Sequence, residues 1–425
     1  MAENEVRLKV MAAKAASKRM AHLSTEAKNM ALLAAADSLE TRQDEILTAN
    51  QADYAEAKAG GMGEAMLDRL LISPARLQGI ANDVRSVAKL PDPVGEIFDM
   101  RTLPNGMQVG HRRVPLGVIA SIYESRPNVT IDISALCLKS GNAVVLRGGK
   151  EAIRSSSVLA RVMSESCEIA GVPVGAVQFL ESTDRALVGQ LLKMRDAIDL
   201  VIPRGGAGLI KFVVENATMP VVTGGIGVCH TYVDRLADLE MAVKVVYNAK
   251  VRRPTICNAL DTLLVHRDVA AAFLPVIAAE WQKAGVEIRG DERSLAILAG
   301  LAGDGPKVVP ATAADWGMEF LALVAAVKVV DSADEALSHI EEYGSGHSEA
   351  IITEDYSAAM RFLAEVDAAA VYVNVSTQFT DGAQFGLGAE VGISTQKMHA
   401  RGPMGLKELT TYKWIILGNG QIRPL

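Results

Sequence analysis

The sequence has little that would bind nucleic acid, cross a membrane or direct secretion. Its formal net charge is −7 and its pI is near 5.6, whereas nucleic-acid binding needs a basic face. The apolar runs Val118–Ile122 and Val327–Val330 are far too short to span a bilayer. The N-terminus mixes charged residues with Ala and lacks the apolar centre of a signal peptide. We therefore expect a cytoplasmic protein that binds neither nucleic acid nor membranes.

Cysteine and aromatic residues are also scarce. The chain has 4 cysteines (Cys137, Cys167, Cys229 and Cys257) without a CxxC pair, so neither a disulfide framework nor a zinc site is expected. Aromatic residues make up 4% of the chain, while hydrophobic residues as a whole make up 49%. The cores must therefore be aliphatic. Some of the thiols should fill these cores, which leaves the question of whether one is reactive.

A chain of 425 residues is expected to form two or three domains. Its first hundred residues have apolar side chains at helical spacing, which predicts a helix over Glu3–Ala21 and another from the N-cap Ser24 toward Ile46. Ser73-Pro74 begins a further helix, with Ser at the N-cap and Pro at the first helical position. Leu90–Pro93 ends it.

Beyond Pro104 the pattern changes to strands. Asn105-Gly106 between Arg101–Leu103 and Gln108–Val114 predicts a hairpin with a type I′ turn. Buried strands are then expected at Gly117–Glu124, Ala143–Arg147, Ala176–Glu181 and Ala197–Ile202, with helices beginning at Val129, Glu151, Asp184 and Gly206. This alternation predicts right-handed crossovers and a parallel, doubly wound sheet.

A second α/β unit is expected after a break near Pro220–Gly227. Its predicted elements are a helix at Leu236–Lys250, a strand at Asp261–His266, a helix at Val269–Ala284, strands at Leu323–Val330 and Ala350–Thr353, a helix at Tyr356–Val366 and a strand at Ala370–Val375. Gly382–Gly405 is Gly-rich and irregular, and Tyr412–Leu417 resembles a final strand.

Cys257 differs from the other cysteines in its surroundings. It lies in a loop with Arg252, Arg253 and Pro254, between a predicted helix and a strand, where a thiol can be exposed. Guanidinium groups nearby stabilise a thiolate. The alternative is a buried structural Cys, which suits Cys137 and Cys167. Cys229 is a rival nucleophile because His230 adjoins it, although neighbouring residues on a strand point to opposite faces.

Several ordered segments carry a family resemblance. They are Tyr123–Thr130, Lys139–Asn142, Arg147–Ala152, Asn248–Ala259, Gly388–Thr395 and His399–Leu406. On these segments the chain resembles the aldehyde dehydrogenase superfamily. Within it, the chain is similar from end to end to the gamma-glutamyl phosphate reductase (glutamate-5-semialdehyde dehydrogenase) family. The resemblance implies that Cys257 is the nucleophile.

The resemblance also implies an α/β fold with two Rossmann-like parallel-sheet domains and a β-flap for oligomerisation. Residues 1–103 and 115–231 would bind NADPH, and residues 232–375 would form the catalytic domain. Residues 104–114 and 400–425 would form the flap, and residues 376–399 would return to the cofactor domain.

An oxyanion formed by thiolate attack needs fixed donors, each worth about 3 kcal/mol of barrier. By resemblance these are the side-chain amide of Asn128 and the backbone N–H of Cys257. Asn128 could equally be a helix N-cap. Hydrolytic relatives carry a Glu before a Gly-Gly pair, whereas this chain reads Val221-Val222-Thr223-Gly224-Gly225, without a carboxylate. The missing base favours an acyl phosphate reductase, because the thioester would then escape hydrolysis.

The usual GxGxxG fingerprint of dinucleotide binding is missing from the first strands. Arg147 and Lys150 beside Gly148 could face an adenosine ribose, where a 2′-phosphate favours cations. Gly205 and Gly206 open a helix whose N–H groups suit a pyrophosphate, although Gly at such turns commonly serves geometry alone. Glu319 matches the superfamily carboxylate that holds the nicotinamide ribose, and its alternative is a solvated surface residue.

The implied reaction is the NADPH-dependent reduction of L-glutamyl 5-phosphate to L-glutamate 5-semialdehyde in proline biosynthesis. Arg126, Arg253, His230 and His347 are candidates for holding the phosphate and the α-carboxylate. One departure concerns Gln378, where the family suggests Arg. This change would weaken a substrate contact or leave it to another residue.

Two rival functions remain open. A coenzyme A-acylating aldehyde dehydrogenase would also lack the general base, and a non-catalytic scaffold could keep the same fold. The resemblance further implies a homo-oligomer and is compatible with functional coupling to glutamate 5-kinase. No metal is expected.

Overall fold

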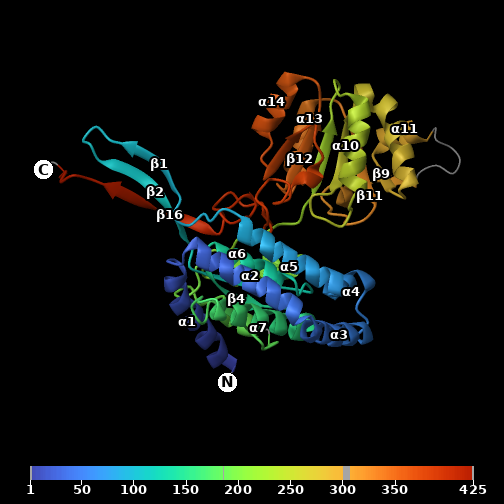
Figure 1. Ribbon diagram of the computed structural model, residues 1–425. Coiled ribbons are helices and arrows are strands. Elements are labelled where there is room, and N and C mark those ends of the chain that lie inside the picture. The colour runs from blue at the N-terminus through green and yellow to red at the C-terminus, as the bar shows by residue number, and fades with distance from the viewer. Residues whose placement is uncertain (1, 185, 300–306, 424–425) are drawn as a thin grey trace. The chain divides into compact units, whose positions relative to one another are not determined.

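The N-terminal part of the chain is helical in the computed structural model, which describes residues 2–184, 186–299 and 307–423 (Figure 1). The helices are α1 (Ala2–Met20), α2 (Thr25–Thr41), α3 (Gln43–Ala59), α4 (Glu64–Leu70) and α5 (Pro74–Lys89). Both predicted N-caps are confirmed, because the hydroxyl of Ser24 accepts the Ala27 N–H and that of Ser73 accepts the Arg76 N–H.

The contacts within the chain divide it into two units. The first unit comprises the chain up to Thr223, together with Gly386–Gly392 and the residues from Met404 onward. The second unit comprises Gly224–Phe385 and Ile393–Pro403. Strand β7 begins at Cys229 and pairs within the second unit's sheet, so the second unit starts a few residues before the expected boundary after residue 231.

The first unit contains a parallel sheet with strand order β5-β4-β3-β6. Its strands are β3 (Val118–Tyr123), β4 (Ala143–Arg147), β5 (Val177–Phe179) and β6 (Leu200–Arg204). The connecting helices are α6 (Val129–Lys139), η1 (Lys150–Ala152), α7 (Ile153–Ile169), α8 (Ala186–Leu191) and α9 (Ala207–Asn216). The helix expected from Asp184 is thus described from Ala186, and Arg185 lies outside the described residues. Because β4 and β6 flank β3 on opposite sides, the strand order reverses beside β3, a common place for ligand binding at strand carboxyl ends.

A separate antiparallel sheet of the first unit pairs β1 (Ile97–Thr102), β2 (Gln108–Pro115) and β16 (Thr410–Leu417). Figure 1 shows this flap sheet extending away from the helices of its unit. The predicted hairpin is present, but the type I′ turn is wrong. Gly106 donates its N–H to the Leu103 carbonyl, so Pro104 and Asn105 are the central residues of the turn. A type I′ turn needs positive φ at both central residues, which proline cannot adopt, and the positive φ lies at Gly106 instead.

The second unit is built on a parallel sheet with strand order β10-β9-β11-β8-β7-β12-β13. Its strands are β7 (Cys229–Val233), β8 (Leu260–His266), β9 (Glu287–Gly290), β10 (Val308–Pro310), β11 (Val324–Val330), β12 (Ser348–Ile352) and β13 (Ala370–Val373). Its helices are α10 (Leu239–Val251), α11 (Arg267–Lys283), α12 (Glu292–Leu298), α13 (Ala333–Tyr343) and α14 (Tyr356–Glu365). Short elements complete it: η2 (Ala313–Asp315), η3 (Thr377–Phe379), β14 (Ile393–Ser394) and β15 (Gly402–Pro403).

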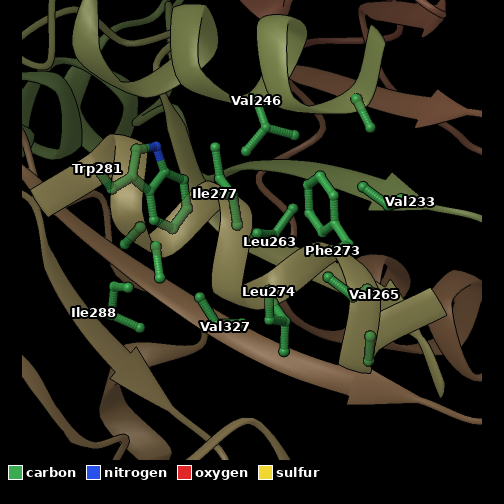
Figure 2. Close-up of a cluster of buried hydrophobic side chains, with 14 of the residues drawn as sticks. Val233, Val246, Leu263, Val265, Phe273, Leu274, Ile277, Trp281, Ile288 and Val327 are labelled. Carbon is green, nitrogen blue, oxygen red and sulfur yellow. The ribbon is translucent and has the colours of Figure 1, made fainter. Parts of the chain in front are cut away.

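The core of the second unit lies between this sheet and the helices α10 and α11. Figure 2 shows Phe273 and Trp281 of α11 among aliphatic side chains of β8, β11 and α10. Both aromatic side chains are fully buried. Removing a side chain of this size from a core costs about 3–5 kcal/mol, so α11 holds the sheet firmly in place.

Candidate active site

Cys257 lies in the loop between α10 and β8, at the amino end of the second unit's sheet. It is half-buried, whereas Cys137, Cys167 and Cys229 are buried. Burial raises the pKa of the Cys167 thiol to about 12 and raises the pKa values of Cys137 and Cys229 well above the ordinary range. These three thiols stay protonated at neutral pH and are poor nucleophiles. The contrast favours Cys257 and removes Cys229 as its rival.

The residue after Cys257 is anchored from both sides. The side-chain amide of Asn258 donates to the carbonyl oxygens of Gln378, at 3.3 Å, and Thr380, at 3.0 Å. The Thr377 hydroxyl donates to the carbonyl oxygen of Asn258 at 2.7 Å. All of these groups belong to the segment around η3, which fixes the peptide that follows Cys257. No local sequence pattern signalled the roles of Thr377 and Thr380.

Gln378 also anchors the segment before Cys257. Its Nε2 donates to the carbonyl oxygens of Ala249, at 2.8 Å, and Arg253, at 3.4 Å. Its Oε1 accepts a hydrogen bond from Nη1 of Arg252 at 3.2 Å. The Gln378 side chain is buried and saturated by these bonds. It therefore replaces the expected Arg with an internal tie between α10 and the Cys257 loop.

Gly227 packs directly against the Cys257 peptide. A Cβ at Gly227 would overlap the carbonyl oxygen of Cys257, so a side chain there would displace the loop. The same carbonyl accepts a hydrogen bond from the Cys229 thiol at 3.3 Å. The N–H of Gly227 donates to Oε1 of Glu319 at 3.0 Å. Glu319 is only partly exposed, and burial raises its pKa, so it is not the freely solvated residue of the alternative.

The two candidate histidines are buried in the second unit. Nδ1 of His230 lies 3.0 Å from Oε2 of Glu349, and neither side chain is accessible beyond 1%. His347 Nδ1 lies 2.8 Å from the Ser348 hydroxyl, and burial lowers the His347 pKa to about 4. His347 is therefore neutral at pH 7. Each of these two candidates for the substrate's anionic groups is enclosed and faces internal polar groups, and its role at the substrate stays a prediction.

In the first unit, Asn128 occupies the N-cap position of α6 but its side chain does not cap the helix. Nδ2 instead donates to Oδ2 of Asp132 at 2.8 Å, one helical turn further on. Burial raises the pKa of Asp132 to about 7. The capping alternative for Asn128 thus fails. Asp132 was missed from the sequence, although its i+4 spacing from Asn128 was a usable signal.

The carboxyl end of β4 carries the residues expected at the adenosine ribose. Arg147 donates to the Thr183 carbonyl at 3.2 Å, and Lys150 is exposed. Gly148 is buried, and a Cβ there would lie 3.1 Å from the Ser156 hydroxyl. Glu151 accepts the N–H and the hydroxyl of Ser125, and its carboxylate lies against Gly149. The cations therefore keep an accessible position beside the strand end.

The expected pyrophosphate donors have an internal partner. The N–H of Gly206, at the start of α9, donates to Oε2 of Glu124 at 3.0 Å. A Cβ at Gly205 would lie 2.5 Å from the same carboxylate oxygen. A phosphate at Gly205 and Gly206 would require Glu124 to move. Glu124 directly follows β3, and no sequence pattern at that position predicted this contact.

The remaining candidates, Arg126 and Arg253, are exposed. In Val221–Gly225, Val222 donates its backbone N–H to the Val201 carbonyl, and the stretch supplies no acidic side chain. Among the described residues, no group of His, Cys, Asp and Glu side chains is arranged to hold a metal ion. No helix in residues 2–184, 186–299 and 307–423 is long and apolar enough to cross a membrane.

Comparison with known proteins extends these observations. A model of the aldehyde dehydrogenase family matches residues 1–294 and 308–415. A gamma-glutamyl phosphate reductase of Dehalococcoides mccartyi is 64% identical, over 99% of this chain and 98% of that protein. The crystal structure of gamma-glutamyl phosphate reductase from Thermotoga maritima is 47% identical, covers 99% of this chain and 100% of its own, and has a TM-score of 0.95. An acetylating aldehyde dehydrogenase from Geobacillus thermoglucosidasius, covering 100% of this chain and 98% of its own, shares the fold at 19% identity and a TM-score of 0.71.

Proposed function

Because the chain belongs to the aldehyde dehydrogenase family, we propose that it uses NADPH to reduce L-glutamyl 5-phosphate to L-glutamate 5-semialdehyde in proline biosynthesis. The observation that carries this proposal is the half-buried Cys257 on an anchored loop, while the other thiols are buried. Relatives that share 64% and 55% of their residues with this chain are gamma-glutamyl phosphate reductases, which supports the substrate.

In the proposed reaction the Cys257 thiolate attacks the acyl carbon of the substrate. The bond to the phosphate oxygen breaks, phosphate leaves with the electron pair, and a thioester remains on Cys257. The oxyanion formed on the way would accept hydrogen bonds from the Cys257 N–H and the Asn128 amide. The ties of Asn258 to the η3 segment and of Asn128 to Asp132 would hold these donors in place.

The residues at the carboxyl end of β4 fit an NADPH molecule. Exposed Lys150 and the neighbouring Arg147 would hold the 2′-phosphate, and Gly148 between them lets the strand end pack against Ser156. Glu319 would bind the nicotinamide ribose through its second oxygen, since Oε1 is bonded to Gly227. When bound, NADPH supplies the hydride that converts the thioester to the aldehyde level.

Water attack on the thioester would lack an activating base. The stretch Val221–Gly225 has no carboxylate, and general-base catalysis is worth about 10²- to 10⁴-fold. A long-lived thioester suits reduction and, in the reverse direction, exchange with phosphate. The exposed Arg126 and Arg253 remain our candidates for holding the anionic groups of the substrate.

Replacing Cys257 tests the proposal. We expect Cys257→Ser to lose at least about 10³-fold in NADPH-dependent reduction of the acyl phosphate, since a serine hydroxyl is far less ionised than a thiol. Cys167→Ala, at a buried thiol, should keep most of the activity. The same serine variant retaining most of its activity would exclude the thioester. Selective alkylation of Cys257 at neutral pH in the wild type would in turn argue against a non-catalytic scaffold.

The acceptor distinguishes the two enzymatic candidates. In the reverse direction, glutamate 5-semialdehyde and NADP should give NADPH rapidly with inorganic phosphate and slowly with coenzyme A. A preference for coenzyme A would favour the acylating aldehyde dehydrogenase. The reductase proposal predicts phosphate, because the relatives named above are gamma-glutamyl phosphate reductases and share far more residues with this chain than the acetylating enzyme does.

The flap sheet supports a homo-oligomer. Tyr412, Trp414, Ile416 and Leu417 of β16 are each more than half exposed, which is unusual for a row of large apolar side chains. Sedimentation of the full chain would measure the assembly. The four free thiols support a reducing compartment such as the cytoplasm. The substrate would be supplied by a glutamate 5-kinase, and functional coupling to such an enzyme follows from the instability expected of an acyl phosphate.

A further inference from the structure

Arg252 lies close to Cys257 in sequence and has no role in the proposed reaction as described above. It is an exposed residue at the C-cap of α10, five positions before Cys257 in sequence. Its hydrogen-bond partner is Oε1 of Gln378, at 3.2 Å. Within the described residues no carboxylate forms an ion pair with Arg252. The positive charge of Arg252 is therefore held in place by a neutral group.

Gln378 can hold Arg252 in one orientation only. Its Nε2 donates to the carbonyl oxygens of Ala249 and Arg253, and these groups can only accept. The amide oxygen must then face Arg252, because a reversed amide would place oxygen against oxygen. Gln378 is 5% exposed, so its side chain has little freedom to turn.

The same residue connects Arg252 with the nucleophile's neighbour. The backbone carbonyl of Gln378 accepts the Asn258 amide at 3.3 Å, and Asn258 follows Cys257 directly. Arg252 and the Cys257 loop thus share one rigid support. A guanidinium fixed in this way pre-forms its fork of donors for a carboxylate or phosphate.

We infer that Arg252 binds an anionic group of the acyl phosphate substrate and that Gln378 is its positioning residue. This inference rests on the proposed function. It also accounts for Gln378 where the resemblance suggests Arg, since the cation is then supplied from the adjoining position 252. The guanidinium forms one hydrogen bond to Gln378 and keeps further N–H groups for the ligand.

A purely structural role for Arg252 is the alternative. A cation at a helix C-terminus stabilises the helix dipole, and Arg252 caps α10. This role predicts a change in thermal stability without a change in KM. The two roles are therefore separable by measuring both quantities in the same variants.

The experiment compares Arg252→Gln with Arg235→Gln, which removes an exposed Arg at the opposite end of the same sheet, after β7. In the reverse reaction, the KM for glutamate 5-semialdehyde and that for inorganic phosphate are measured separately. We expect Arg252→Gln to raise one of them on the order of 10- to 100-fold with a smaller change in kcat, because a charge-assisted bond is lost. A higher KM for the aldehyde assigns the carboxylate, and a higher KM for phosphate assigns the phosphate. Arg235→Gln should change neither.

The double variant Arg252→Gln with Gln378→Arg sharpens the test. It returns the guanidinium to position 378 and the amide to position 252. The double variant should therefore reverse much of the increase in KM that Arg252→Gln causes. Unchanged KM values in Arg252→Gln would overturn the inference, as would a double variant no better than the worse single variant. Protection of Cys257 from alkylation by L-glutamate or phosphate gives a readout without turnover. A wild type that reduces no acyl phosphate would instead contradict the proposed function.

Discussion

The two parallel sheets carry their candidate chemistry at opposite ends. In the first unit, Asn128, Lys150 and Gly206 follow the carboxyl ends of β3, β4 and β6, where ligands commonly bind in open α/β sheets. In the second unit, Cys257 precedes β8, and the buried Cys229 and His347 lie at the amino ends of β7 and β12. Only the first sheet therefore carries its candidate residues at the carboxyl ends of strands, where ligands commonly bind.

The two sets of candidate residues also differ in the sequence separation of the hydrogen bonds that fix them. In the first unit, Asn128 is held by Asp132, only four positions further along the chain, whereas Gly206 bonds Glu124 across 82 positions. The Cys257 loop relies on contacts across more than a hundred residues, through Gln378 and Thr380. A loop at an amino end has no helix directly after it, so long-range hydrogen bonds must fix it.

After Cys257→Ser, the largest expected effect comes from Gly227→Ala in the second unit. Its Cβ would overlap the backbone carbonyl of Cys257, which cannot swing aside as a side chain could. A displacement near 1 Å at a reacting group costs about 100-fold, so kcat should fall at least that far. Steady-state kinetics and thermal unfolding would measure the effect.

Gly208→Ala in α9 is the matched control for that variant. A Cβ at Gly208 meets nothing within 4 Å, so alanine should keep activity and raise helix stability by about 0.5–1 kcal/mol. Equal losses of activity in both variants would show that Gly227 has no special contact with the nucleophile loop.

A smaller effect is expected from Lys150→Gln at the carboxyl end of β4. Losing the cation beside the proposed 2′-phosphate should raise the KM for NADPH by about tenfold and leave the KM for NADH unchanged. Kinetics with the two cofactors measure this directly. Lys211→Gln on the neighbouring α9, where Lys211 pairs with Glu215, should change neither value. An equal rise for both cofactors would remove Lys150 from the 2′-phosphate.

The smallest effect concerns Asp132 and pH. Its pKa of about 7 lies above its ordinary value because burial disfavours the charge, and Asp83 raises it further while Arg204 opposes the rise. Ionised Asp132 can only accept, which keeps Nδ2 of Asn128 turned toward it. Protonated Asp132 can donate and permits a reversed amide. Activity should therefore rise as pH increases through about 7.

The Asp132→Asn variant should flatten that pH profile and lower activity by about three- to tenfold, since its amide can bond Asn128 in either orientation. Asp83→Asn should move the midpoint to lower pH by removing a neighbouring negative charge. A wild-type profile without a step near pH 7, or one unchanged in Asp132→Asn, would contradict a positioning role for Asp132.

Local signals predicted much of the fold. Ser24 and Ser73 began helices where their caps indicated, and β3, β4, β8 and β11 lie within about two residues of the predicted strands. The alternation of elements predicted parallel sheets, which the structure shows. The short strands β7, β9 and β10 and the short helix α12 were not predicted, because brief segments depend on their neighbours in the sheet. Helix α13 was also missed, although its N-cap Ser332 and its helical periodicity were usable signals.

The site was less predictable than the fold. Proline and arginine near Cys257 indicated an exposed loop from local sequence alone. The burial of His230 against Glu349 depends on a partner 119 residues away, and the Arg252–Gln378 bond spans 126 residues. No spacing rule reports such pairs. Asp132 could have been found from its spacing to Asn128, whereas only the folded backbone shows that Glu124 accepts the Gly206 N–H.

The repeated passage of the chain between the two units has a consequence for inheritance. The first unit includes β16 and Gly386–Gly392, which are encoded after the whole of Gly224–Phe385. A gene cut at residue 385 would leave the flap without the strand that pairs with β2 and would also remove β14 and β15 from the second unit. Exchange of one unit between related genes would therefore need several coordinated crossovers. The two units are expected to be inherited as a single piece.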